Sequence, residues 1–181
     1  RSITGMEIQE KMVERAQRSV RLNGMDGAIQ IFQGDIRDLP EEMCVESYEV
    51  VTANPPYRLT ETGRVASDDE RAMARHEFNG GLADFLRAAA GLLDTGGRFF
   101  VVYNTERLPE LLSEMRCFRL EPKRLRMVHS TWDEPARMVL VEGRKNGKPG
   151  LQVEPPLIVY RGTGREYSAE VLAMYGMGGE T

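Results

Sequence analysis

The chain has 181 residues, enough for one well-buried domain, and we expect residues 1–181 to form a single domain. Hydrophobic residues make up 41% and charged residues 29%, which is ordinary for a soluble globular protein. The net charge is −4, with no signal peptide and no apolar run long enough to span a bilayer, so we expect a cytoplasmic protein without a membrane partner. The chain starts at Arg1 without an initiating Met, which is consistent with a fragment.

In its first half the chain alternates short apolar segments with helical patterns. The polar stretch 58–78 is too long for an ordinary connection, which indicates a functional lid or a disordered loop. Residues 98–103 form a continuous apolar run, as in a strand that is covered on both faces. The other expected strands are 3–7, 28–32 and 50–51, and the expected helices are 8–22, 79–93 and 106–115, with a helical turn at 39–44 and a turn at 95–97.

From residue 117 the pattern changes to paired strands. Residues 119–129 and 137–142 predict an antiparallel hairpin with a loop at 131–135. A turn at 146–150, an extended segment at 157–160 and a short helix at 168–175 follow. The fold class we predict is α/β: a doubly wound, mostly parallel sheet with helices on both faces, ended by the hairpin.

Charge is unevenly distributed along the chain. Residues 1–115 hold 13 Lys and Arg against 20 Asp and Glu, whereas residues 116–165 hold 11 against 5. A basic, β-rich part, 116–165, belonging to the same domain, would suit a phosphate backbone that meets one face of the molecule. The alternative is a solvated, Arg-rich edge of an antiparallel sheet.

Neither the cysteines nor the histidines predict a metal site. Cys44 and Cys117 are far apart and have apolar neighbours, which favours reduced, buried thiols. His76 and His129 belong to no metal-ligand spacing.

The most informative segment is Asn54-Pro55-Pro56-Tyr57, which follows the β-branched run 48–53. Two prolines fix φ and remove two backbone donors, so the carbonyls of Asn54 and Pro55 stay available as acceptors. The Asn54 side chain adds another acceptor, and Tyr57 offers a stacking face. The segment is therefore suited to hold a planar amino group; the alternative is a turn that ends a strand.

These four residues resemble the Asn-Pro-Pro-Tyr motif of class I S-adenosylmethionine methyltransferases that modify exocyclic or amide nitrogens. The resemblance implies that Asn54 and the Pro55 carbonyl accept hydrogen bonds from the target NH₂, while Tyr57 stacks on the substrate. It implies catalytic roles for Asn54, Pro55, Pro56 and Tyr57, and S-adenosyl-L-methionine as the cofactor.

Acidic residues at two further strand ends fit an adenosyl pocket. Glu7 can bind both ribose hydroxyls, Asp35 can accept a hydrogen bond from the adenine amino group, and Ile8 and Ile36 can form apolar walls. The family has matching Glu-x-x and Gly-Asp-Ile segments, so cofactor binding is assigned to Glu7, Ile8, Asp35, Ile36 and Asn54. The family's Gly-rich loop, which should precede Arg1, has no match, and we expect the sheet to lack its first, central strand and the following helix.

Other segments resemble the bacterial family that methylates the N6 of an adenosine beside the anticodon of valine tRNA: Ala74-Arg75-His76-Glu77, residues 126–129, 135–145 and 147–160. His129 is followed by Ser-Thr-Trp, which departs from the expected pattern. The resemblance implies tRNA, specifically valine tRNA, as the partner. The residues expected to bind the substrate or RNA are His76, Arg124, Arg126, Trp132, Arg137, Lys145 and Lys148.

Several alternatives stay open. His76 could cap the base pocket or pair with a carboxylate inside a loop, and Trp132 could stack on a nucleotide or pack on its own hairpin. The runner-up enzyme is a glutamine-N5 methyltransferase that acts on release factors, to which the basic tail is less suited. A non-catalytic RNA-binding fragment is the third possibility.

Overall fold

The computed structural model describes residues 2–45, 47–56, 81–162 and 164–177. Most of its strands belong to one six-stranded sheet, in which β3 and β4 are parallel while β6 lies antiparallel between β4 and β5. Two short strands, β7 and β8, pair in parallel with β5. The bounds are β3 (Tyr48–Ala53), β4 (Leu93–Asn104), β5 (Leu120–His129), β6 (Met138–Lys145), β7 (Gln152–Val153) and β8 (Leu157–Ile158).

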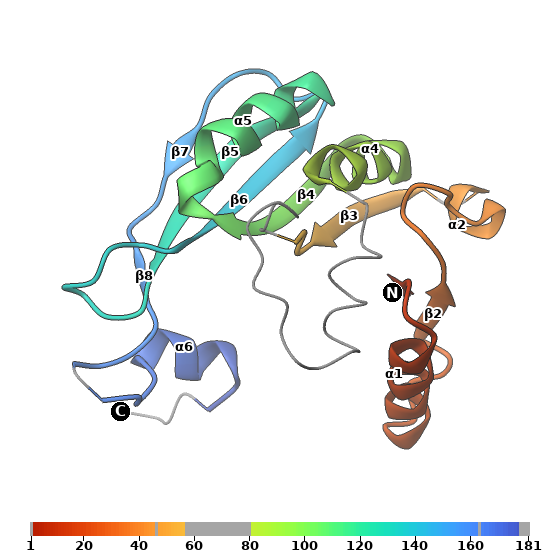
Figure 1. Cartoon of the computed structure of the whole chain (residues 1–181), viewed down its shortest axis with the longest axis horizontal. Helices are drawn as coiled ribbons and strands as arrows, with labels where there is room; N and C mark the ends of the chain where they lie inside the picture. Colours follow the sequence, from red (N-terminus) through yellow and green to blue (C-terminus); the bar gives the residue numbers. More distant parts are fainter. Residues whose placement is uncertain (1, 46, 57–80, 163, 178–181) are drawn as a thin grey trace, which may run out of the picture.

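A second, two-stranded sheet contains β1 (Ile3–Glu7) and β2 (Ile29–Gln33), which are parallel and joined by α1 (Glu10–Leu22). The short helix α2 (Glu41–Val45) then leads to β3 at the other sheet (Figure 1). The described strands thus have the alternating pattern of a doubly wound α/β fold, interrupted between β1 and β3.

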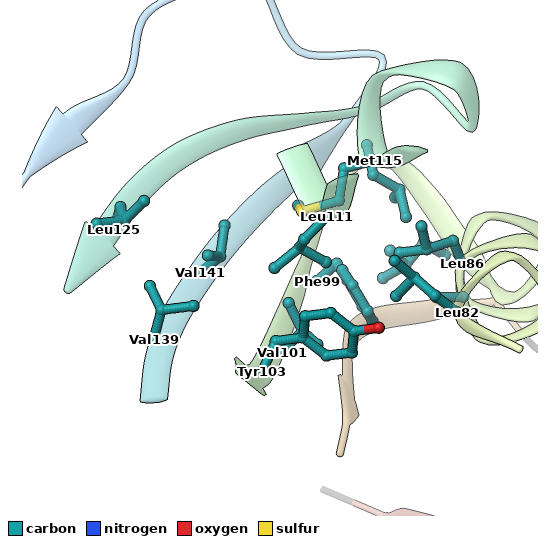
Figure 2. Close-up of a cluster of buried hydrophobic side chains, with 13 residues drawn as sticks. Leu82, Leu86, Phe99, Val101, Tyr103, Leu111, Met115, Leu125, Val139 and Val141 are labelled. Carbon is teal, nitrogen blue, oxygen red and sulfur yellow. The ribbon is translucent and has the colours of Figure 1, made fainter. Parts of the chain in front are cut away.

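Two helices cover one face of the six-stranded sheet and form the core with it. They are α4 (Leu82–Leu92) and α5 (Leu108–Cys117), the latter preceded by a 3-10 turn, η2 (Thr105–Arg107). Because side chains alternate along β4, Phe99, Val101 and Tyr103 are buried against these helices (Figure 2). Arg98, between them and the start of the strand, is exposed. Gly143 allows α5 to approach β6 closely, since a Cβ there would lie 2.5 Å from the Met115 Cε.

Several predicted boundaries are wrong by a few residues. The expected turn at 95–97 lies inside β4 as an irregularity, with Gly96 at φ 80° and the pairing with β3 shifting between Tyr48 and Val50. Leu93 is already extended, so α4 ends one residue earlier than expected. The strand expected at 137–142 extends to Lys145, because its register with β5 continues to Leu120.

The prediction of buried thiols is also wrong, since Cys44 and Cys117 are both exposed. Cys117 is the last residue of α5, two positions after the buried Met115. A step of two residues turns a helical side chain roughly 200° away from the buried face.

Candidate active site

A cavity of about 830 Å³ lies between the facing edges of β1 and β3. All five residues of β1 line it, together with most of β3 and apolar side chains of α4 that include Phe85 and Ala89. Its volume is within the range of small-molecule sites, roughly 300–1,000 Å³. Glu7, the last residue of β1, and Asn54, directly after β3, both line this cavity.

The structure brings the expected cofactor residues together in this cavity. Glu7, Ile8, Asp35, Ile36 and Asn54 all line it, although they come from three separate strand ends. Glu7 is half-buried, and its Oε1 accepts a hydrogen bond from the backbone N–H of Gln9 at 2.9 Å. That bond orients the carboxylate at the start of α1. Carboxylates and an amide beside apolar walls are a donor and acceptor set that fits a nucleoside with free hydroxyls.

Asp35 has a partner that the sequence analysis missed. Its carboxylate accepts hydrogen bonds from the backbone N–H of Arg37 at 2.9 Å and from the Arg37 guanidinium, in a bidentate ion pair. These hydrogen bonds lower the pKa of Asp35 below its usual value. The ion pair holds Asp35 ionised at the rim of the cavity. The Asp-x-Arg pattern directly after a strand is the sequence feature from which this ion pair could have been predicted.

The Asn54-Pro55-Pro56 segment follows β3 directly. Asn54 is exposed at the cavity, whereas Pro55 is among the fully buried side chains and Pro56 is exposed. The buried proline ring therefore anchors the backbone next to Asn54. Tyr57 and His76 lie outside the described residues.

Strand register shows which of the expected RNA-binding residues lie near the level of Asn54. Ala53 pairs with Val101, Val101 with Val141, and Val141 with Leu125, so the next position along β5, Arg126, is level with Asn54. The β5–β6 loop continues past this level and carries Trp132 and Arg137 beyond the strand ends. Trp132 is 76% exposed, so it does not pack on its own hairpin.

Lys145 and Lys148 lie toward the opposite end of the sheet. Lys145 is five residues from Leu140 along β6, which corresponds to roughly 16 Å. Its Nζ donates a hydrogen bond to the Leu93 carbonyl, and Lys123 Nζ donates to the Lys148 carbonyl. These two lysines are therefore separated from the Asn54 edge.

Arg124 and Arg126 already have carboxylate partners within the protein. Arg124 contacts Glu142 and Glu154, and Arg126 forms a bidentate pair with Glu170 while donating to the carbonyls of Pro155 and Pro156. The hydrogen bond to Glu154, with that to Glu142, raises the pKa of Arg124, and the hydrogen bond to Glu170 raises the pKa of Arg126. Any phosphate contact would have to share or displace these partners.

In the described part of the chain, no group of three or more His, Cys, Asp and Glu side chains is arranged to hold a metal ion. The helices described there are also too short or too polar to cross a membrane.

Comparison with known proteins assigns the chain to a family. A family model described as RMKL-like, methyltransferase domain, matches residues 1–134. The chain belongs to this methyltransferase-domain family. The match includes β1 to β5 and the three strand ends that carry Glu7, Asp35 and Asn54.

The chain is also similar to curated enzymes named tRNA1(Val) (adenine(37)-N6)-methyltransferase. The one from Porphyromonas gingivalis is 28% identical over 144 residues, which cover 78% of this chain and 56% of that protein. The one from Histophilus somni is 25% identical over 168 residues, which cover 93% of this chain and 67% of that protein. The chain thus spans little more than half of the first relative's length.

Solved methyltransferase structures share the fold. A structure from Agrobacterium tumefaciens, described as a predicted O-methyltransferase, matches 98% of this chain and 78% of its own with a TM-score of 0.71 at 19% identity. Geranyl diphosphate C-methyltransferase from Streptomyces coelicolor, solved with S-adenosyl-L-homocysteine, matches 78% of this chain and 64% of its own with a TM-score of 0.54 at 12% identity. Both matches support a class I methyltransferase fold for this chain.

Proposed function

We propose that this chain is part of an S-adenosylmethionine-dependent methyltransferase that acts on the N6 amino group of an adenosine in tRNA. The observation that carries the proposal is the meeting of Glu7, Asp35 and Asn54 around one cavity. Family membership and the names of the curated relatives support both the reaction and the substrate. When bound, S-adenosyl-L-methionine supplies the methyl group. Glu7 would bind its ribose. Ile8 and Ile36 would pack against its adenine, and Asp35 would lie near the edge of the adenine ring.

Asn54 would orient the amine that is methylated. An aryl amine donates its lone pair into the ring, so acceptors on both of its hydrogens favour the pyramidal, more nucleophilic form. The Asn54 side-chain oxygen and the Pro55 carbonyl would provide these two acceptors, and burial of the Pro55 ring keeps them in place. No general base is assigned, because the amine becomes acidic after methylation and water can take the proton.

The substrate assignment to valine tRNA rests on the relatives' names and on the basic part 116–165. Trp132 and Arg137, at the Asn54 edge of the sheet, are suited to contact RNA around a splayed base. A base must leave its stack for its amino group to enter such a cavity. The exposed indole ring offers a face on which a neighbouring base can stack.

The test measures methyl transfer from labelled S-adenosylmethionine to unmodified valine tRNA and, in parallel, to a release factor. Replacing Asn54 by Ala is expected to reduce transfer to tRNA by about 100-fold, the scale for losing one oriented polar group at a reacting centre. Gln30→Ala removes an exposed amide that does not line the cavity, so this control should keep full activity. Unchanged turnover in Asn54→Ala, or labelling of the release factor alone, would refute the proposal.

A further inference from the structure

Three tyrosine rings lie next to one another near the C-terminal end of the described chain, and we refer to Tyr160, Tyr167 and Tyr175 as the tyrosine row. Tyr160 and Tyr167 are nearly parallel, with ring centroids 5.5 Å apart and planes 16° apart. Tyr175 continues the row at 5.8 Å from Tyr167, tilted by 41°. Exposure rises along the row, since Tyr167 is 40% exposed and Tyr175 is 64% exposed. The last ring thus presents much of its surface to solvent.

Hydrogen bonds and an ion pair hold the backbone that carries the tyrosine row. Tyr160 and Tyr167 form an antiparallel bridge, and the Arg161 N–H donates to the Glu166 carbonyl at 2.8 Å. Tyr175 follows α6 (Ala169–Met174), whose first turn is capped by the Ser168 hydroxyl. The ion pair between Glu170 of this helix and Arg126 ties α6 to β5. An aromatic surface fixed in this way loses little conformational entropy when a ligand stacks on it.

Its location is at the same edge of the sheet as Asn54. β8 pairs with the last residues of β5, and the Tyr160 N–H donates to the Ser130 carbonyl at 2.8 Å, beyond the end of that strand. Since β5 runs parallel to β3, both strands end at this edge. The row follows β8, which pairs with β5 on the side away from β6, so four strand spacings, roughly 19 Å, separate it from β3. Figure 1 shows α6 below β8, to the side of β3.

The charges beside the row favour an anionic partner. Arg161, Arg165 and Glu166 are exposed in the short segment between Tyr160 and Tyr167, which leaves one net positive charge there, and Glu170 is already neutralised by Arg126. Alternating aromatic rings and arginines are typical of surfaces that bind single-stranded nucleic acid, where rings stack on bases and guanidinium groups contact phosphates.

We propose that the tyrosine row is a stacking site for an unpaired nucleotide of the RNA substrate, with Tyr175 in contact with the base and Arg161 and Arg165 in contact with the flanking phosphates. This inference rests on the proposed function for its choice of RNA. The base would extend the row as a fourth ring. It would belong to a nucleotide separated from the target adenosine, because the row and Asn54 lie at the same end of the strands but four strand spacings apart.

The experiment measures the Kd of the 181-residue chain for a short, unstructured, labelled oligoribonucleotide by fluorescence anisotropy. Tyr175→Ala is expected to weaken binding by at least about five-fold, the lower end for one stacked base. Tyr175→Phe keeps the ring and should bind like the parent chain. The matched control is Leu151→Ala, which removes a 43% exposed side chain next to β7, and it should also bind like the parent.

The outcomes separate this inference from the proposed function. Unchanged RNA affinity in Tyr175→Ala would overturn the stacking site even if the chain methylates tRNA. Loss of RNA binding in Tyr175→Ala, with retention in Tyr175→Phe, would support it even if no methyl transfer is found. Sedimentation of the same variants tests the alternative that a second copy of the chain covers the row. If Tyr175→Ala dissociates a dimer and leaves the RNA affinity unchanged, the row is a contact between two copies.

Discussion

Replacing Glu7 by Gln tests the cofactor site without removing the local contact that orients this side chain. Glu7 Oε1 accepts the Gln9 N–H at 2.9 Å, and the amide oxygen of Gln can accept the same bond. The substitution therefore preserves size and one acceptor but removes the negative charge. The main interaction that a bound nucleoside would lose is the charge-assisted hydrogen bond from a ribose hydroxyl to Oε2.

The expected loss follows from that single bond. Hydrogen bonds to charged groups contribute about 1.5–3 kcal/mol, which corresponds to a roughly 10- to 150-fold increase in Kd. Isothermal titration with S-adenosylhomocysteine measures it directly and needs no RNA. Glu10→Gln is the matched control, since Glu10 begins α1 and does not line the cavity. Equal affinities for the parent chain and Glu7→Gln would refute the assignment of the ribose to Glu7.

Two further predictions concern stability. Leu111 is fully buried between α5 and the sheet, so Leu111→Ala should lower the free energy of unfolding by about 3–5 kcal/mol, measured by urea denaturation. Leu22 is 75% exposed, so Leu22→Ala should change this free energy little. Similar losses in the two variants would contradict the assigned core. The hydrogen bond from Arg126 lowers the pKa of Glu170 below 4.5, so this pair stabilises the fold above pH 4.5 and ceases to do so as the pH falls through the lowered pKa. In scanning calorimetry, the Tm difference between the parent chain and Glu170→Gln should therefore shrink in acid, and a constant difference would show that the pair's charge is unimportant.

The alternation of apolar segments and helical patterns was sufficient to predict most of the fold. β1, α1, β3 and the buried part of β4 lie where the sequence placed them, because each has a clear periodicity bounded by Gly, Asn or Pro. The cavity residues were also predictable, since polar side chains at the ends of parallel strands meet at one edge. Glu7, Asp35 and Asn54 fulfil that rule.

Other features depend on long-range contacts that local patterns do not contain. β7 has only two residues, and its existence depends on pairing with Arg124 and Leu125 of β5. The ion pair between Arg126 and Glu170 joins residues 44 positions apart. Such contacts are decided by the folded arrangement, so the sequence predicted exposed arginines where the structure has ion pairs.

The division of the strands between two sheets has a consequence for how a ligand would be held. Glu7 and Asp35 are attached to the β1–β2 unit, whereas Asn54 is attached to the six-stranded sheet. Among the described strands, no ladder of backbone hydrogen bonds links these two units, so the span between the carboxylates and the amide is not fixed by strand pairing. A molecule that contacts both units would fix the distance between them. The Tm of the protein would then rise with the concentration of that molecule.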